Sequence, residues 1–200
     1  MSTTRLLLLG AVRIFQPVHG YLLRRELLSW QVDEWAHLNP GSIYSGLRTL
    51  AKQGLLAEVA GEPVAYRLTP DGEVEYQRLL SQGLREPHWS DPTRLLGALC
   101  FWTTLPRDEV REALRARALV LEAMVSGTTS AVRSVQTHRT APASTVELFS
   151  VAGHWLDGER AWVAQVSARI DAGHYAFAGE PGANAGPVDG TWPPALPDMD

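Results

Sequence analysis

Residues 38–56, LNPGSIYSGLRTLAKQGLL, have the pattern of a single capped amphipathic helix. Asn39 is a favoured N-cap and Pro40 a favoured first helical residue. Apolar residues recur at helical spacing on one side, and Gly54 suits the left-handed position that ends many helices. We therefore predict a helix over residues 40–54, whose outer side carries Ser42, Tyr44, Ser45, Arg48 and Lys52.

The segments around this helix predict the rest of an N-terminal domain. Thr3–Phe15 reads as a mostly apolar helix that Gln16-Pro17 ends, and a shorter helical pattern begins at Tyr21. Two apolar segments, 55–59 and 64–68, flank a turn-rich tip and predict a two-stranded wing. Two short helices followed by a hairpin describe a winged helix-turn-helix.

Four motifs resemble, in order and spacing, those of the PadR family of transcriptional regulators. The resemblance covers roughly residues 5–80 and implies a winged helix-turn-helix followed by a helical dimerisation region, in a family whose members are mostly repressors. It also implies that Ser42, Tyr44, Arg48 and Lys52 face the DNA and that Tyr21 meets a phosphate. The motifs are His19-Gly20-Tyr21, Asn39-Pro40-Gly41-Ser42-Ile43-Tyr44, Leu47-x-x-Leu50-x-x-x-Gly54-Leu55 and Tyr66-Arg67-Leu68-Thr69-x-x-Gly72.

The sequence departs from the family pattern in the helix and in the wing. Ser45-Gly46 stands where the family often has Pro-Ala, and Thr49 replaces one of the family's cations, so the helix has one cation fewer and a glycine in its middle. The wing carries Glu58 and Glu62 and a single basic residue, Arg67. We therefore expect the helix to make most of the DNA contacts. Ser45, in the same helix, and Arg67, on the wing, are the remaining candidate DNA-binding residues.

Charge leaves two classes of function open. The net charge is −4, and residues 1–86 hold nine Lys and Arg against nine Asp and Glu, so the first domain is neutral. A neutral domain can bind DNA if its cations lie on one face, with an affinity that depends on salt. The alternative is a winged-helix module that binds another protein and has lost specific DNA binding, which the acidic wing would suit.

The C-terminal half predicts paired helices and a tail. Asp91-Pro92 is typical of a helix start, and residues 107–126 have a nearly heptad-like apolar stripe. Residues 127–142 are rich in Ser and Thr and predict a loop. Residues 144–171 predict a last long helix. We assign residues 1–86 to the DNA-binding domain, 87–171 to a helical dimerisation region and 172–200 to a disordered tail, with Trp192-Pro193-Pro194 docking transiently. The fold class is mainly α with a small β wing.

The sequence contains seven tryptophans, an unusual number for its length. Three of them, Trp102, Trp155 and Trp162, lie on the predicted dimerisation helices. They are candidates for a pocket that binds a small aromatic effector, as some members of the resembled family do. Ordinary interface packing is the alternative and the one we favour for most of them, because tryptophan is enriched in both settings.

The sequence contains no pattern typical of an enzyme, a metal protein or a membrane protein. We find no catalytic motif, no phosphate loop and no Cys/His cluster at metal-ligand spacing, so we expect neither an enzyme nor a cofactor or metal. No apolar run is long enough to cross a membrane, and a signal peptide is not indicated. The single Cys100 reads as a buried residue in a reducing, cytoplasmic setting. His19 is expected to bond a local backbone group.

These observations predict a cytoplasmic, homodimeric regulator of transcription. It would act as a repressor, bind double-stranded DNA at an inverted repeat through helix 40–54, and be released by a small aromatic effector. Dimerisation is expected because a single helix-turn-helix module contacts few base pairs, whereas a two-fold dimer binds two half-sites about 34 Å apart.

Overall fold

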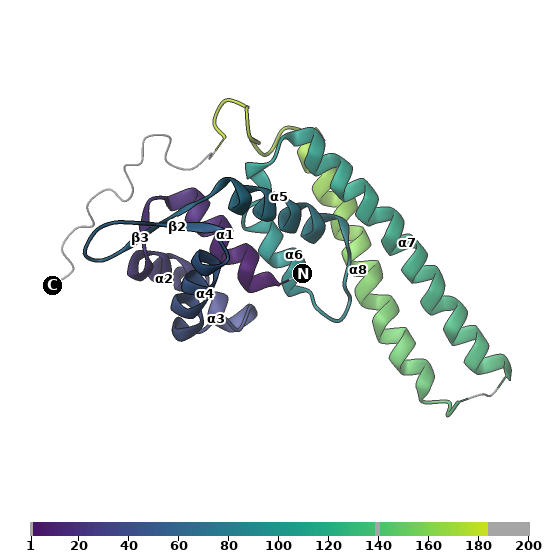
Figure 1. Ribbon diagram of the computed structural model, residues 1–200. Helices are drawn as coiled ribbons and strands as arrows, with labels where there is room; N and C mark the ends of the chain where they lie inside the picture. The colour runs from purple at the N-terminus through teal and green to yellow at the C-terminus, as the bar shows by residue number, and fades with distance from the viewer. Residues whose placement is uncertain (1, 139–140, 184–200) are drawn as a thin grey trace.

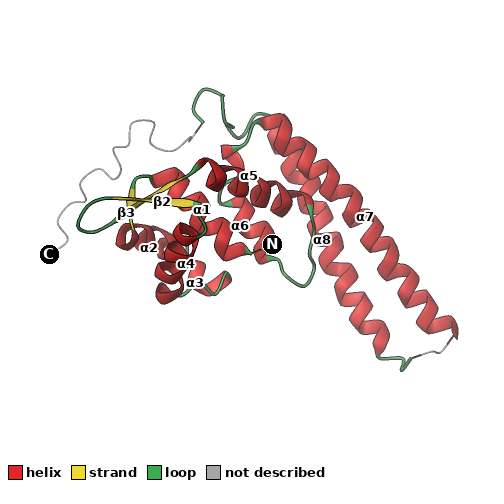
Figure 2. Cartoon of the chain, in the orientation of Figure 1, coloured by secondary structure: helices red, strands yellow, loops and turns green. Residues whose placement is uncertain are grey.

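The computed structural model of the chain describes residues 2–138 and 141–183. They form an N-terminal winged helix-turn-helix and a long helical hairpin that projects away from it (Figure 1). Helices dominate, and the strands make one small sheet (Figure 2). The predicted fold class, mainly α with a β wing, is confirmed.

Helix α1 (Thr3–Phe15) is the centre of the N-terminal domain. Ser2 caps it by accepting a hydrogen bond from the Arg5 amide, and the chain leaves the helix at Gln16-Pro17, as predicted. The consecutive residues Leu6–Leu9 are at most 1% exposed, because four helices surround α1: α2 (Gly20–Ser29), α4 (Pro40–Lys52), α5 (Pro70–Arg85) and α6 (Thr93–Leu99). This explains why α1 is apolar on more than one side.

The helix-turn-helix consists of α2 (Gly20–Ser29), the short α3 (Val32–Trp35) and α4 (Pro40–Lys52). The wing follows as β2 (Leu56–Val59) and β3 (Ala65–Leu68), which pair antiparallel with Leu56 opposite Leu68. A third strand, β1 (Val18–His19), was not predicted and pairs with β3, so the sheet order is β1-β3-β2. Two residues are too few for a sequence pattern to indicate a strand.

Helix α5 (Pro70–Arg85) connects the domain to the hairpin. Thr69 caps it through a hydrogen bond from the Gly72 amide to the Thr69 hydroxyl, at 3.0 Å. Gly72 is required at this position, because a Cβ there would lie 2.0 Å from the carbonyl oxygen of Leu55. The helix packs against α1 on one side and against α6 (Thr93–Leu99) and α7 on the other.

The hairpin, which we call the arm, consists of α7 (Arg107–His138) and α8 (Thr145–Asp171), joined to α6 through the short 3-10 helix η1 (Trp102–Thr104). Helix α8 was predicted within one residue, but the expected loop over residues 127–142 was wrong because α7 continues to His138. The hydroxyls of Thr128 and Thr129 donate hydrogen bonds back to the Val125 carbonyl, and packing against α8 overrides the weak helix propensity.

The chain after α8 is the second correction. Residues 172–183, the C-terminal segment, fold back along the base of the arm, although they were expected to belong to a disordered tail. Phe177 is 0% exposed, and the Ala178 amide donates to the carbonyls of Thr103 and Leu105. One buried aromatic ring supplies the apolar burial that composition alone did not indicate. Residues 184–200, with Trp192-Pro193-Pro194, lie outside the described residues.

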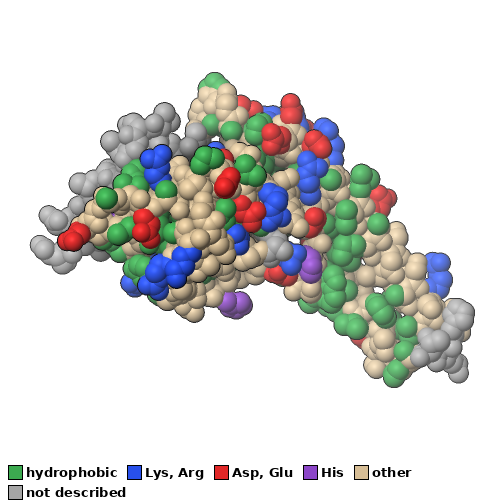
Figure 3. All heavy atoms as spheres, viewed as in Figure 1, with side chains coloured by type: hydrophobic (Ala, Val, Ile, Leu, Met, Phe, Trp, Pro, Cys, Tyr) green, Lys and Arg blue, Asp and Glu red, His purple; other side chains and the backbone are tan. Residues whose placement is uncertain are grey.

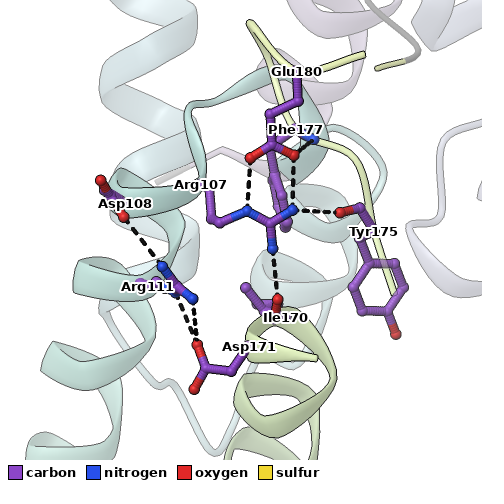
Figure 4. Close-up of polar contacts among 8 residues, drawn as sticks. All are labelled: Arg107, Asp108, Arg111, Ile170, Asp171, Tyr175, Phe177 and Glu180. Carbon is purple, nitrogen blue, oxygen red and sulfur yellow. Dashed lines mark hydrogen bonds and ion pairs between the residues drawn. The ribbon is translucent and has the colours of Figure 1, made fainter. Parts of the chain in front are cut away.

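Arg107 fastens the C-terminal segment to α7 (Figure 4). Its guanidinium donates to both carboxylate oxygens of Glu180, at 2.6 and 2.7 Å, and to the carbonyls of Ile170 and Tyr175. The guanidinium also lies over the ring of Phe177, 4.9 Å from its centroid. The hydrogen bonds that Glu180 accepts from the Arg107 guanidinium and from the Phe177 amide lower the pKa of this carboxyl group to about 2.

The structure also corrects the expectation that Cys100 is buried. It was predicted to be a buried small hydrophobe, but it is exposed at the end of α6, where its thiol donates to the Leu96 carbonyl. The neighbouring Phe101 takes the buried position instead.

Candidate nucleic-acid interface

Helix α4 begins with the predicted cap. The Asn39 side-chain oxygen accepts hydrogen bonds from both the amide and the hydroxyl of Ser42, at 2.9 and 3.0 Å. Pro40 fills the first helical position, and Ile43, Leu47 and Leu50 are buried on the inner side. The Ser42 hydroxyl thus donates within the cap and keeps its lone pairs as acceptors for a partner.

Two glycines set how closely α4 lies to its neighbours. A Cβ at Gly46 would lie 2.4 Å from Leu8 Cδ1, so this glycine lets α4 approach α1. A Cβ at Gly20 would lie 3.0 Å from Cε1 of Tyr44, so the Tyr44 ring rests on the start of α2. The mid-helix Gly46 lowers helix propensity, but it therefore also has a packing role.

The outer side of α4 is open to solvent. Tyr44, Ser45, Arg48, Thr49 and Lys52 are exposed, with Tyr44 at 36% because of its contact with Gly20. The hydroxyls of Ser45 and Thr49 donate to the carbonyls of Ser42 and Ser45 within the helix. The donors that remain free of such bonds on this side are those of Tyr44, Arg48 and Lys52.

The cations of the N-terminal domain divide into two groups. Among the described residues, no acid lies within ion-pair distance of four cations, which lie on α2, α4 and the wing: Arg24, Arg48, Lys52 and Arg67. Each of the other five pairs with a carboxylate: Arg5, Arg13, Arg25, Arg78 and Arg85. Figure 3 shows Lys and Arg side chains gathered over the region of α2 and α4.

Arg24 is the residue that our list of candidates missed. It is exposed on α2 without an ion pair, whereas the neighbouring Arg25 pairs with Glu26 at 2.9 Å. The two arginines are adjacent in the sequence of this helix. Only the structure shows which of the two is neutralised.

Tyr21 lies at the first turn of α2, next to the wing. It is 54% exposed and stacks on His19, with ring centroids 5.9 Å apart and planes inclined by 10°. His19 Nδ1 lies 3.4 Å from the Val64 carbonyl oxygen, so its partner is a backbone group, though not the local one expected. The phenol of Tyr21 is thus held beside the wing, with its hydroxyl in solvent.

The wing is mixed in charge. Glu58 and Glu62 are exposed, and Arg67 is exposed on β3. Burial and the nearby Glu58 raise the pKa of Tyr66, and Arg48 opposes them, so these groups share one electrostatic environment at the junction of α4 and the wing. Successive side chains of a strand point to opposite faces, so Arg67 projects away from the face that carries Tyr66.

The three candidate effector tryptophans do not lie together. Trp102 packs on Tyr175 and Phe177, with ring centroids 5.0 and 5.6 Å away, and Trp162 packs against the core. Trp155 is 57% exposed, and its ring lies 6.4 Å from that of Trp89. Packing therefore describes Trp102 and Trp162, and Trp155 remains a candidate.

The part of the chain that the structure describes contains no group of three or more His, Cys, Asp or Glu side chains that could hold a metal ion. None of its helices is long and apolar enough to cross a membrane.

Comparison with known proteins agrees with this geometry. Residues 8–78 match the model of the Transcriptional regulator PadR-like family, and no curated protein matches the chain. A PadR-like transcriptional regulator, BC1756 from Bacillus cereus, is 16% identical over 85% of this chain and 99% of its own, with a TM-score of 0.36.

Two structures of Bacillus subtilis PadR are also similar. The complex with operator DNA is 19% identical over 84% of this chain and 98% of its own, with a TM-score of 0.35. The complex with p-coumaric acid is 18% identical over 84% and 97%, with a TM-score of 0.34. The family match confirms the resemblance in the sequence motifs, and residues 8–78 of the chain are similar to the PadR-like transcriptional regulators.

Proposed function

We propose that the protein is a homodimeric, DNA-binding repressor of transcription that binds an inverted repeat in double-stranded DNA through α4. The observation that carries this proposal is the division of the cations. In a domain of zero net charge, the arginines and the lysine around α4 are left without acids, while the others are neutralised. An anionic partner with repeating charges fits such a face.

The side chains of α4 have different roles in this proposal. Tyr44, Arg48 and Lys52 offer free donors for base edges and phosphates, and Ser42 and Ser45 offer acceptors. In this proposal, Tyr21 and Arg24, exposed on α2, and Arg67, exposed on β3, bind the DNA backbone. The exposed acids of the wing tip leave base recognition to the helix.

Dimerisation is proposed on the apolar residues that the arm leaves in solvent. Leu119 is 69% exposed and Leu148 is 56% exposed, and Val120 and Val151 lie near them in sequence with about two fifths of their surface exposed. Figure 3 shows hydrophobic side chains along the visible side of the arm. A second copy would cover them and bring two α4 helices onto one face of the DNA. We also infer a cytoplasmic location, in keeping with the lone Cys100, and release by a small aromatic effector.

The first experiment measures DNA binding. Operator sequences are selected from random DNA, and affinity is followed by fluorescence anisotropy at several salt concentrations. Arg48→Ala is expected to weaken operator binding by about 10-fold or more. Arg78→Ala is the matched control, because Arg78 is exposed but paired with Glu75.

One alternative function has a specific observation in its favour. The exposed Glu58 and Glu62 on the wing suit a module that binds a basic protein partner instead of DNA. In that case no operator would be selected, and Arg48→Ala and Arg78→Ala would not differ in their affinity for DNA. Light scattering decides the assembly separately: Leu119→Glu is expected to convert the dimer to a monomer, and a monomeric wild type at micromolar concentration would contradict the proposed dimer.

A further inference from the structure

The His19-Gly20-Tyr21 motif lies where α2, α4 and the wing meet. Val18 and His19 form β1, which pairs with β3 of the wing, and α2 begins at the next residue, Gly20. Nδ1 of His19 lies 3.4 Å from the carbonyl oxygen of Val64, in the loop between the two wing strands. Gly20 is buried and lies against α4. One turn of the chain therefore contacts both the wing and the helix that we propose to bind the bases.

Gly20 makes room for an aromatic ring of α4. An ideal Cβ at this position would lie 3.0 Å from Cε1 and 3.3 Å from Cδ1 of Tyr44, and 3.6 Å from Cδ1 of Leu47. Cε1 and Cδ1 are neighbouring atoms on one edge of the ring, so this edge lies on the backbone of α2. Gly20 is helical and is not among the glycines with a positive φ. Its missing side chain is therefore explained by the ring and not by the backbone conformation.

The contact with Gly20 orients Tyr44 at the proposed DNA-binding face. Tyr44 is 36% exposed, and its hydroxyl has no hydrogen-bond partner among the described residues. The direction of the ring is thus set by packing and not by a hydrogen bond within the protein. A hydroxyl binds an acceptor well only when the two oxygen or nitrogen atoms lie within about 3.0 Å of each other. Where the ring rests therefore decides which group on the DNA the hydroxyl can reach.

We propose that Gly20 is a positioning residue for base recognition, which holds the Tyr44 ring so that its hydroxyl contacts one base pair in each half-site. The proposal rests on the proposed function, because it assigns the base preference at one operator position to the contact between α2 and α4. A direct contact from one fixed side chain discriminates against the wrong base pair at its own position. The effect of Gly20 is accordingly confined to the base pair that Tyr44 contacts.

A methyl group at residue 20 would move the ring. Carbon atoms pack at about 3.5–4.0 Å, so Gly20→Ala requires the Tyr44 ring to retreat by roughly 0.5–1 Å. Because Tyr44 is partly in solvent, the ring can yield to this methyl group without disruption of the core. The same displacement is large enough to break a hydrogen bond from the hydroxyl to a base. Base preference should therefore respond more than the stability of the fold.

The first experiment compares base preferences. Binding sites are selected from random DNA with wild type, with Gly20→Ala and with Tyr44→Phe, which keeps the ring but loses the hydroxyl. We expect both variants to lose about 5-fold or more of the preference at the same base pair of each half-site, and to keep the preferences elsewhere. The double variant should match Tyr44→Phe, because the glycine acts only through that hydroxyl.

Gly97→Ala is the matched control. Gly97 is also a buried glycine within a helix, and its ideal Cβ would also lie 3.0 Å from a side-chain atom, Cγ2 of Thr3. It lies on α6 and crowds α1 instead of α4. This variant should change the urea midpoint by an amount similar to that of Gly20→Ala and leave every base preference unchanged.

Three outcomes of the selection would overturn the proposal. The first is an unchanged preference in Gly20→Ala at the base pair that Tyr44→Phe affects. The second is a loss of affinity that is equal for all DNA sequences, which a purely structural role of the glycine would produce. The third is a double variant that loses more of this preference than Tyr44→Phe alone.

The second experiment needs no DNA. The tyrosines are replaced by meta-fluorotyrosine, and the fluorine resonance of Tyr44 is assigned as the one that Tyr44→Phe lacks. Gly20→Ala should shift this resonance, and Gly97→Ala should not. An unshifted resonance would show that the ring does not rest on Gly20 and would overturn the proposal whether or not the protein binds DNA. If the resonance shifts but wild type selects no operator, the proposed function fails and the positioning role with it, while the contact itself stands.

Discussion

The face around α4 and the base of the arm use their arginines in opposite ways. Around α4, Arg24 and Arg48 are exposed and make no ion pair with described residues. At the base of the arm, Arg107, Arg111 and Arg117 are all paired, with Glu180, Asp171 and Glu159. The apolar residues are reversed, because α1 is buried on all sides while the arm leaves Leu119 and Leu148 in solvent.

This difference separates structural cations from contact cations within one chain. A guanidinium that is buried and paired holds helices together, and its loss destabilises the fold. A guanidinium that is exposed and unpaired contributes little to stability, so several such cations gathered on one face fit a partner outside the chain. The same reasoning makes the free apolar side of the arm a surface for another apolar group.

The largest effect is expected at Arg117. Arg117→Ala leaves Glu159 and the carbonyls of Gly83 and Leu84 without their buried donor, so it should lower the free energy of unfolding by about 3–5 kcal/mol. Urea denaturation followed by tryptophan fluorescence measures this change.

The controls for Arg117 are two exposed arginines without ion pairs among the described residues. Arg115→Ala, on the same helix, and Arg48→Ala, on α4, should each change stability by less than about 0.5 kcal/mol. If Arg48→Ala destabilised the protein as much as Arg117→Ala does, the distinction between contact and structural cations would be lost.

The second largest loss of stability is expected for a substitution of Phe177. Its ring is fully buried against Trp102, so Phe177→Ala should destabilise the protein by about 3 kcal/mol or more and detach the C-terminal segment from η1. Hydrogen exchange at the Ala178 amide reports the detachment directly. An unchanged stability would mean that this segment adds nothing to the arm, as the sequence composition had suggested.

The sequence predicted what local chemistry determines. The Asn39-Pro40 start and the helical spacing of the apolar residues Ile43, Leu47 and Leu50 each depend on residues within one or two helical turns, and both are found as expected. The predicted roles of Tyr21, Arg48 and the other site residues remain predictions.

What the sequence missed depends on partners far along the chain. Strand β1 forms only because β3 pairs with it, and α7 extends past residue 126 because α8 packs beside it. Phe177 is buried against the distant Trp102. Such contacts join residues that no local pattern connects.

Gly46 tests whether close approach to α1 positions α4. Gly46→Ala places a methyl group 2.4 Å from Leu8 Cδ1, in a core where Leu8 is 1% exposed, and should destabilise the protein by about 1–3 kcal/mol. Gly127→Ala is the matched control, because Gly127 also lies within a helix but has no atom within 4 Å of its ideal Cβ. It should stabilise the protein by about 0.5–1 kcal/mol. Equal effects would show that helix propensity alone explains both glycines.

The smallest effect is expected at Glu180 and depends on pH. Because Arg107 and the Phe177 amide lower the pKa of Glu180 from 4.5 to about 2, its charged form stabilises the folded state above about pH 4.5, and this contribution is lost as the pH falls toward about 2. Glu180→Gln should therefore be less stable than wild type at pH 6, and the difference in urea midpoint should shrink at pH 3. Glu109→Gln, at an exposed residue of α7 without an ion pair among the described residues, should match wild type at both values. A difference for Glu180→Gln that did not change with pH would assign the contact to packing of the side chain, and Arg107 would then be a structural cation through the Ile170 and Tyr175 carbonyls alone.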